Sequence, residues 1–267
     1  MATYSLGYDD AEIARLEGQA QLIREPTRVL LEASGIAPGM RVLDLGTGLG
    51  HVAAAVAEMV GPDGQVVGVD VDSRMLELAR ARTEHLPHVQ LVEADVTRWR
   101  GSEPFDAVVG RLILFHLQDP VGVLRHHLES VRPGGRVVML DYDIGGLRTE
   151  PGDPFTTRMA ALVMGAFRAA GADPTIGSRL QSILAAAGAE EVGGLAIAQY
   201  LSSDDPVGPA MLAAVVRSLA PVMVAHGLTT EAELDLDTLA ARTADTLRSL
   251  DAVLVPPLLS GAWGGRP

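Results

Sequence analysis

Residues 42–50, VLDLGTGLG, constrain the fold more than any other stretch of the sequence. Aliphatic residues flanking an aspartate are typical of a buried strand, and the glycines that follow predict a tight turn at its end. Gly46, Gly48 and Gly50 lack a Cβ atom, so they can adopt positive φ and let a ligand approach the backbone N–H groups that begin the next helix. The stretch therefore predicts a strand, a ligand-binding turn and a helix in succession.

Strands and helices alternate from Met40 to Asp141, a pattern that predicts βαβ units and a parallel sheet. We expect an α/β fold of the Rossmann-like, doubly wound type, with a mostly parallel seven-stranded sheet and helical cap segments. Asp72 and Asp119 are placed to cap two of the helices. The strands of this region are expected at 41–45, 65–70, 89–93, 105–110 and 135–141.

The flanking segments are expected to be mostly helical. An N-terminal helical cap is predicted over 1–35, and the Rossmann domain over 36–267, with helical lid insertions near 145–180 and 203–252. The insertions are rich in Ala, Leu, Val and Met, which suits a lid that closes over an apolar ligand. Such helices are also common as plain core elements, which is the alternative reading of these segments.

Composition excludes several kinds of chemistry. The net charge of −13 would repel a phosphate backbone, so no nucleic acid partner is expected. The absence of cysteine excludes disulfides and thiolate metal sites, and the absence of lysine excludes a Schiff base and a Walker-type phosphate site. The N-terminus has no signal-peptide pattern, and the most apolar window, 211–228, contains Arg217 and Pro221, so we expect a cytoplasmic protein without a membrane partner.

Two classes of ligand compete for the glycine turn. A dinucleotide fingerprint would have its third glycine at the position of His51, where a side chain hinders the close packing of helix on strand. The stretch VVGVDVD ends the second strand at Asp70, whose carboxylate is placed to accept hydrogen bonds from the two hydroxyls of a ribose. The pattern favours a nucleoside over a pyrophosphate.

At this point the chain resembles the class I S-adenosylmethionine-dependent methyltransferases of the bacterial small-molecule type. The similar motifs are the turn at 44–50, Asp70, LVEADVTRW (91–99), FDAVVGRLILFHLQDP (105–120) and VRPGGRVVMLD (131–141), so the resemblance covers about residues 38–141. It implies S-adenosylmethionine as cofactor and S-adenosylhomocysteine as product. It also implies that Asp44 braces the turn or reaches the cofactor through water, and that Asp95 and Val96 hold the adenine. The cofactor-binding residues expected on this basis are Asp44, Gly46, Thr47, Gly48, Gly50, Asp70, Val71, Met75, Asp95, Val96, Arg111, His116 and Tyr8.

The resemblance implies transfer of a methyl group to a small, largely apolar acceptor, in secondary metabolism. A cyclase or isomerase that binds the same cofactor without methyl transfer, a noncatalytic sensor and a nicotinamide oxidoreductase stay open as alternatives. A homodimer is also left open.

Histidine 116 is the first candidate for a general base, because it follows the fourth strand and an imidazole suits removal of a hydroxyl proton. Its alternative role is to pack beneath the cofactor. Asp141, Tyr142 and Asp143 follow the fifth strand, where Asp141 and Tyr142 are expected to orient the acceptor. We expect no metal site, since Gly110 and Arg111 stand where metal-using relatives place a carboxylate. His126 and His127 are adjacent in a helix and face different ways.

Overall fold

The computed structural model describes residues 10–267, so Tyr8, expected at the cofactor, lies outside the described residues. Seven strands form one sheet in the order β3-β2-β1-β4-β5-β9-β7. The first five pair in parallel, and β9 is antiparallel to both of its neighbours. This confirms the predicted fold class. The strands are β1 (Arg41–Leu45), β2 (Gln65–Asp70), β3 (Val89–Glu93), β4 (Phe105–Arg111), β5 (Val131–Asp143), β7 (Glu190–Ile197) and β9 (Leu258–Gly265).

Strand β5 begins at Val131, earlier than the expected residue 135. Val131 pairs with Phe105, and the register then shifts so that Arg136 pairs with Ala107. The irregularity contains Pro133 and two glycines, which interrupt a regular ladder and hid the start of the strand in the sequence.

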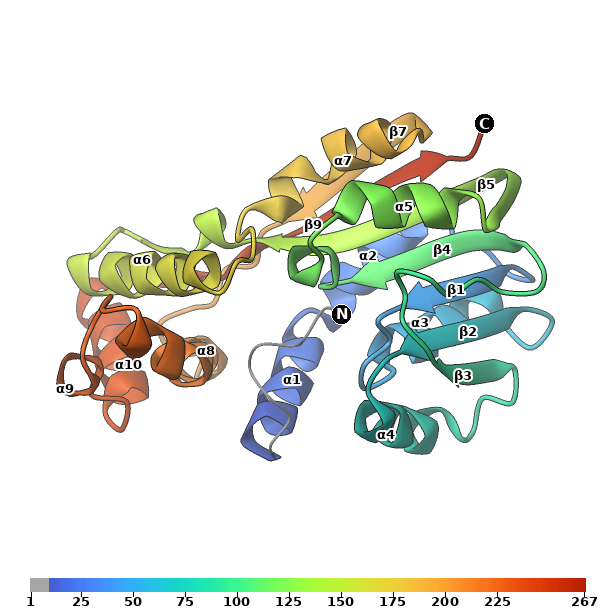
Figure 1. Cartoon of the computed structure of the whole chain (residues 1–267). Coiled ribbons are helices and arrows are strands. Elements are labelled where there is room, and N and C mark those ends of the chain that lie inside the picture. Colours follow the sequence, from blue (N-terminus) through green and yellow to red (C-terminus); the bar gives the residue numbers. More distant parts are fainter. Residues whose placement is uncertain (1–9) are drawn as a thin grey trace.

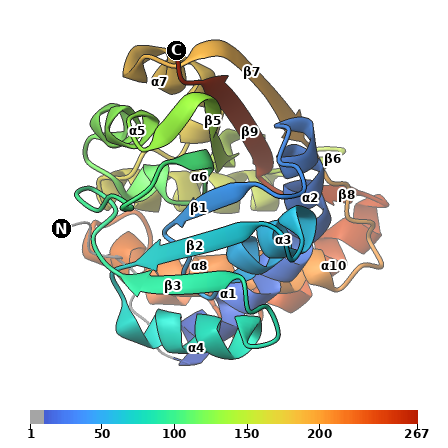
Figure 2. The same ribbon diagram turned by 90° about the vertical axis from the view of Figure 1, so that its right-hand side faces the viewer.

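Helices cover both faces of the sheet because alternate strand residues point to opposite sides. Val42 packs on one face with α2 (Arg24–Ala33) and α3 (His51–Val60), and Leu43 packs on the other with α5 (Pro120–Leu128) and α7 (Leu180–Ala187). Figures 1 and 2 show these two helical layers. Helix α4 (Ser73–Thr83) contacts β3 and β2. Asp72 and Asp119 cap α4 and α5 as the sequence predicts, by accepting from Met75 N and Gly122 N.

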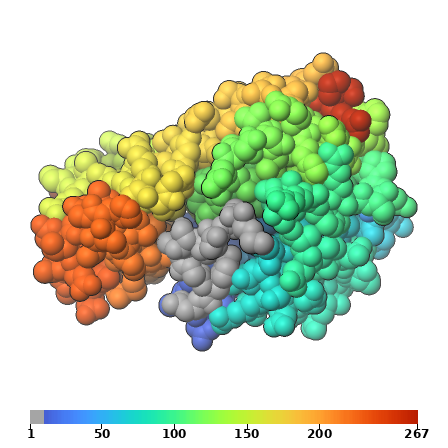
Figure 3. Space-filling view, in the orientation of Figure 1, coloured from blue at the N-terminus to red at the C-terminus, as the bar shows by residue number. Residues whose placement is uncertain are grey.

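A second hydrophobic core holds the lid, which lies beyond the carboxyl ends of β1 and β4 in Figure 1 and forms a separate lobe in Figure 3. A two-stranded sheet, β6 with β8, joins the two lid segments at their bases. Of the described helices, α8 is long and apolar enough to cross a membrane by length and composition, and it packs here against α6, α10 and α1. The lid elements are β6 (Arg148–Glu150), α6 (Pro154–Ala169), α8 (Val207–Ala225), α9 (Glu231–Leu234), α10 (Leu239–Leu250) and β8 (Val253–Val255).

The expected cap and the first expected lid segment each pack partly against the lid and partly against the sheet. Helix α1 (Asp10–Leu22) contacts α8 of the lid, whereas Leu30 and Leu31 of α2 are fully buried against the sheet. In the segment 145–180, α6 belongs to the lid core, whereas Ile176 and Leu180 pack in the core of the sheet. The turn η3 (Ile176–Arg179) therefore returns the chain from the lid to the sheet.

Candidate functional site

A cavity of about 500 Å³ lies where the carboxyl ends of the parallel strands meet α1 and the lid. This edge of an open parallel sheet is the usual place for a ligand. Three of the expected site residues, Asp44, Gly50 and Asp141, do not line it. The expected residues that do line it are Gly46, Thr47, Gly48, Asp70, Val71, Met75, Asp95, Val96, Arg111, His116 and Tyr142.

The glycine turn has the left-handed backbone that its composition allows. Gly46, Gly48 and Gly50 have φ angles of +64°, +50° and +79°. A Cβ on Gly46 would lie 2.3 Å from Cδ1 of Ile113, so a side chain there would have to displace the end of Ile113 in addition to adopting the positive φ. A Cβ on Gly50 would lie 2.9 Å from Cβ of Ala79, so this glycine serves the packing of α3 on α4 rather than contact with the cavity.

Asp70 connects the end of β2 to the glycine turn. Its Oδ2 accepts from Gly48 N at 2.8 Å, and its Oδ1 accepts from Asp72 N at 3.0 Å. Burial raises its pKa, and the backbone hydrogen bonds act against that rise. A carboxylate has about four acceptor positions, so two bonds to the backbone leave capacity for the two hydroxyls of a ribose.

Asp44 lies beneath the turn. It is 1% exposed, and its Oδ2 accepts from Thr47 Oγ1 at 2.7 Å. Burial raises its pKa to about 7. This bond matches the bracing role considered for Asp44, because Thr47 lines the cavity while Asp44 reaches it only through Thr47.

The segment after β3 lies beside the end of β2, where Ala94 N donates to Asp70 O at 2.9 Å. Asp95 Oδ1 accepts from Thr97 N at 2.9 Å and from Thr97 Oγ1 at 2.7 Å, and these bonds lower its pKa. Val96 is buried, whereas Val71, directly after β2, is 54% exposed. Asp70 and Asp95 thus both place carboxylate acceptors in the lining of one cavity.

His116 ends the turn η1 (Leu114–His116), which follows β4. It lines the cavity, and burial lowers its pKa to about 4, with the charge of Arg15 adding to the shift. Its imidazole is therefore neutral near pH 7 and able to accept a proton. Asp141, expected to be catalytic, holds this turn instead: it is 1% exposed, and its Oδ2 accepts from Leu114 N at 3.1 Å.

We expect His116→Gln to change how stability depends on pH. The folded pKa of about 4 lies below the ordinary 6.5, so the unfolded chain binds a proton between these values that the native protein does not. Wild-type stability should fall relative to the variant as pH falls through this window, by about 2 kcal/mol between about pH 7 and pH 4.5. Urea unfolding of both proteins measures it, and the comparison cancels the contributions of Asp44 and Asp141. Parallel pH profiles would contradict the expectation.

Arg111 and Tyr142 both line the cavity, and the charge of Arg111 acts on the pKa of Tyr142. Nη1 of Arg111 donates to Thr27 Oγ1 at 2.9 Å, and burial lowers the pKa of Arg111, while the charge of Asp44 acts against that shift. Burial raises the pKa of Tyr142, while the charge of Arg111 lowers it. The Tyr142 side chain thus stays a neutral hydroxyl in the cavity wall. Asp143 faces away into a local turn, where its Oδ1 accepts from Gly145 N.

Sequence reasoning missed a polar contact between α1 and α8 at the cavity. Arg15 lines the cavity and pairs with Glu12 through two bonds of 2.9 and 2.6 Å. Ser218 Oγ of α8 donates to Glu12 Oε2 at 3.0 Å. The spacing of Glu12 and Arg15 by three residues is a local signal for an ion pair, but nothing local pairs them with Ser218.

Leu112 is a second residue that the sequence did not single out. It lines the cavity with φ of +56°, a conformation that a residue with a Cβ adopts rarely. Its N–H donates to Leu140 O at 2.8 Å, which keeps β4 and β5 paired where the chain turns toward η1. Over residues 10–267 there is no cluster of three or more His, Asp or Glu side chains arranged to hold a metal ion.

A mostly parallel sheet, a glycine turn after its first strand, and carboxylates after its second and third strands together define a Rossmann-like, nucleoside-binding protein. Residues 42–135 match the family described as methyltransferase domain. Residues 42–135 thus form a methyltransferase domain of the class I S-adenosylmethionine-dependent type, whose cofactor is S-adenosylmethionine. The family and the cofactor predicted from the sequence are confirmed.

Similar proteins place this match in context. The ubiquinone/menaquinone biosynthesis C-methyltransferase UbiE of Ectopseudomonas mendocina is 32% identical over 136 residues, 49% of this chain and 51% of that protein. An uncharacterized 37.1 kDa protein in transposon TN4556 of Streptomyces fradiae is 38% identical over 116 residues, 43% of this chain and 34% of that protein. The chain therefore spans about half or less of these relatives. A putative methyltransferase from Bacillus halodurans C-125 shares the fold, with a TM-score of 0.55 and 20% identity, over 90% of this chain and 98% of that one.

Proposed function

We propose that the protein transfers a methyl group from S-adenosylmethionine to a small, largely apolar acceptor. The observation that carries the proposal is the continuity of one cavity. At one end it is lined by Gly48, Asp70 and Asp95, and at the other by apolar lid side chains such as Val163 and Leu212. A cofactor held at the first end would meet an acceptor held at the second.

The chain's own residues supply binding, orientation and the exclusion of water. When bound, the cofactor supplies a methyl group already activated by its sulfonium. The lid helices cover the acceptor end with apolar side chains, which keeps water from the reacting centre. His116 is neutral near pH 7 and remains the candidate base for an acceptor hydroxyl, but its pKa of about 4 makes it a weaker base than an ordinary imidazole. Asp141 positions the turn that carries His116. Tyr142 and Arg111 line the same region and are proposed to orient the acceptor.

Calorimetry and product mass test the proposal. We expect S-adenosylhomocysteine to bind and NADH not to bind, because the side chain of His51 stands where a dinucleotide fingerprint has a glycine. With methyl-labelled S-adenosylmethionine and a panel of apolar phenols, carboxylic acids and amines, one class should gain the label as S-adenosylhomocysteine forms. His116→Gln with turnover near the wild-type rate at saturating cofactor would remove His116 as the base.

The same measurements separate the alternatives. A cyclase or isomerase needs the same nucleoside site but releases a product of unchanged mass without S-adenosylhomocysteine. A sensor would bind the cofactor tightly with no turnover. Either outcome would overturn methyl transfer while leaving the cofactor site intact.

The setting of the reaction belongs to the same proposal. A net charge of −13 favours a small-molecule acceptor over nucleic acid. We place the reaction in the cytoplasm and in secondary metabolism, on the resemblance to bacterial small-molecule methyltransferases. A homodimer is the oligomeric state to test first, by light scattering.

A further inference from the structure

The segment 95–99, which follows β3, carries the adenine-side wall of the cavity. Asp95 and Val96 line the cavity, and the segment is stabilised internally because Trp99 N donates to Asp95 O at 2.9 Å. The start of the segment is tied to β2, because Ala94 N donates to Asp70 O at 2.9 Å. From Val96 onward its position depends on the contacts that hold it from α5.

His127 of α5 holds the segment from the core side. It is 0% exposed, and its Nε2 lies 2.7 Å from Val96 O. A carbonyl oxygen only accepts, so the proton is on Nε2 and donates to Val96. Burial lowers the pKa of His127 to about 4, so the ring is neutral near pH 7.

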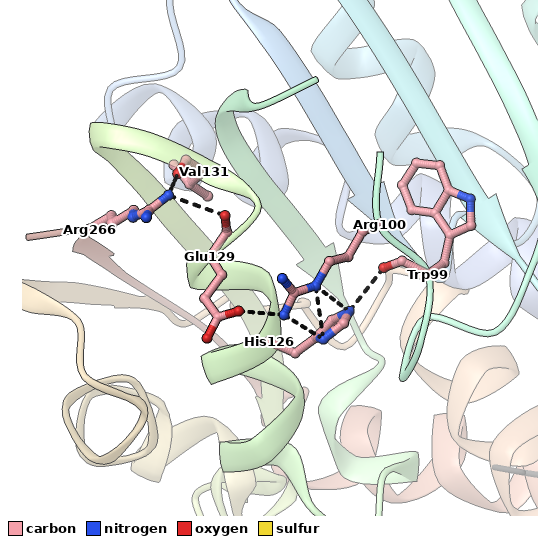
Figure 4. A network of polar contacts seen from close by, with 6 residues as sticks. All are labelled: Trp99, Arg100, His126, Glu129, Val131 and Arg266. Atoms are coloured by element: carbon pink, nitrogen blue, oxygen red, sulfur yellow. Dashed lines mark hydrogen bonds and ion pairs between the residues drawn. The ribbon is translucent and has the colours of Figure 1, made fainter. Parts of the chain in front are cut away.

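His126, the adjacent residue, holds the other end of the segment from the solvent side. Its Nε2 lies 3.1 Å from Trp99 O, and Nε of Arg100 lies 3.2 Å from its Nδ1. One tautomer satisfies both contacts, with Nε2–H donating to Trp99 and Nδ1 accepting from Arg100. Arg100 is held in turn by Glu129 at 2.5 Å. Figure 4 shows this network, which links the end of α5 to the segment.

The two histidines reach one segment because their rings diverge. The ring planes meet at 88° with centroids 5.0 Å apart, so the neighbouring side chains contact carbonyls three residues apart. Neither histidine lines the cavity. The two histidines share no ligand. Instead, His127 binds the first residue of the segment 96–99 and His126 binds the last.

We infer that His127, supported by His126, is a positioning residue for adenine recognition, which it controls by fixing the Val96 carbonyl and thereby the neighbouring Asp95 carboxylate. The inference rests on the proposed cofactor function. Loss of the His127 donor leaves a buried carbonyl unpaired, and the segment relieves that cost by moving away from α5. The displacement changes the fit of the base more than the fit of the ribose, because Asp70 ends the neighbouring strand β2 and does not depend on the Val96 carbonyl.

The test compares His127→Leu with a matched control. His88→Leu removes the same kind of bond, from a histidine Nε2 to Ala57 O at 3.0 Å, and neither His88 nor Ala57 lines the cavity. Calorimetry with S-adenosylhomocysteine and with S-inosylhomocysteine, which has a carbonyl in place of the adenine amino group, measures base selectivity. We expect His127→Leu to lower affinity for S-adenosylhomocysteine about tenfold and to reduce the preference for adenine, whereas His88→Leu leaves both unchanged. His127→Gln, which retains a donor, should restore most of the preference.

Each outcome bears on a different claim. Absence of S-adenosylhomocysteine binding by the wild-type protein would overturn the proposed function, whereas equal selectivity of His127→Leu and His88→Leu would overturn the positioning role alone. A general loss of stability lowers affinity for both ligands by the same factor and leaves their ratio unchanged. If His127→Leu does not fold, the exposed-side variant His126→Leu decides, and an unchanged ratio there overturns the inference.

Discussion

Asp70→Ala is expected to bind S-adenosylhomocysteine about 100-fold more weakly than the wild-type protein. The carboxylate does two things at once: it is proposed to accept the ribose hydroxyls, and it accepts from Gly48 N, which keeps the glycine turn in place. Hydrogen bonds to a charged group contribute about 1.5–3 kcal/mol each, so losing both functions corresponds to roughly two powers of ten in affinity. Calorimetry measures the change directly.

Asp119→Ala provides the matched control for Asp70→Ala. Asp119 also accepts a backbone hydrogen bond, from Gly122 N at 2.8 Å, but it caps α5 and does not line the cavity. Its removal should cost about 1 kcal/mol of stability and leave cofactor affinity unchanged. If Asp70→Ala bound as tightly as Asp119→Ala, the nucleoside site would have to lie elsewhere.

Gly177→Ala is expected to destabilise the protein by about 3 kcal/mol, at the upper end of overpacking effects. A Cβ on Gly177 would lie 2.6 Å from Tyr142 C, 2.7 Å from Asp141 O and 2.7 Å from Asp143 N. All three are backbone atoms of β5, so no side-chain rotation relieves the contact. Either the turn η3 or the end of β5 must move, and in the second case Tyr142 of the cavity wall moves with the strand. Urea unfolding measures the loss.

Gly152→Ala separates this steric effect from the general effect of replacing a glycine. The nearest heavy atom to a Cβ on Gly152 is 3.9 Å away, and its φ is not in the left-handed region. Its unfolding free energy should stay within about 0.5 kcal/mol of the wild-type value. Similar losses in the two variants would show that η3 has more freedom over β5 than the contacts indicate.

The predicted part of the site follows from one topological rule. Gly46 directly follows β1, Asp70 ends β2 and Asp95 comes two residues after β3, and local hydrophobic patterning reveals all three strands. Carboxyl ends of parallel strands meet at one edge, so residues far apart in sequence were expected together, and the cavity lining includes all three. Strands β1, β2 and β3 have the predicted bounds because each is a short, regular ladder without a bulge.

The unpredicted part depends on partners that local patterns do not encode. Asp141 lies near the carboxyl end of β5 like a site residue, yet its carboxylate accepts from Leu114 N, since the chain after β4 folds over it. Ser218 contacts Glu12 across 206 residues, and β6 pairs with β8 across the whole lid. Such contacts form only when distant segments come together in the folded chain, so no hydrophobic periodicity in the sequence predicts them.

The sequence by itself determined the parallel sheet, the glycine turn and the two carboxylates of the nucleoside site. Hydrophobic periodicity is a local property that reveals the strands, and the alternation of strands with helices then makes them parallel. Only the tertiary structure decided which neighbours of those residues face the cavity. Tyr142 lines it and Asp141 does not, and His127 reaches Val96 while His126 reaches Trp99, because side-chain direction is set by packing against distant segments.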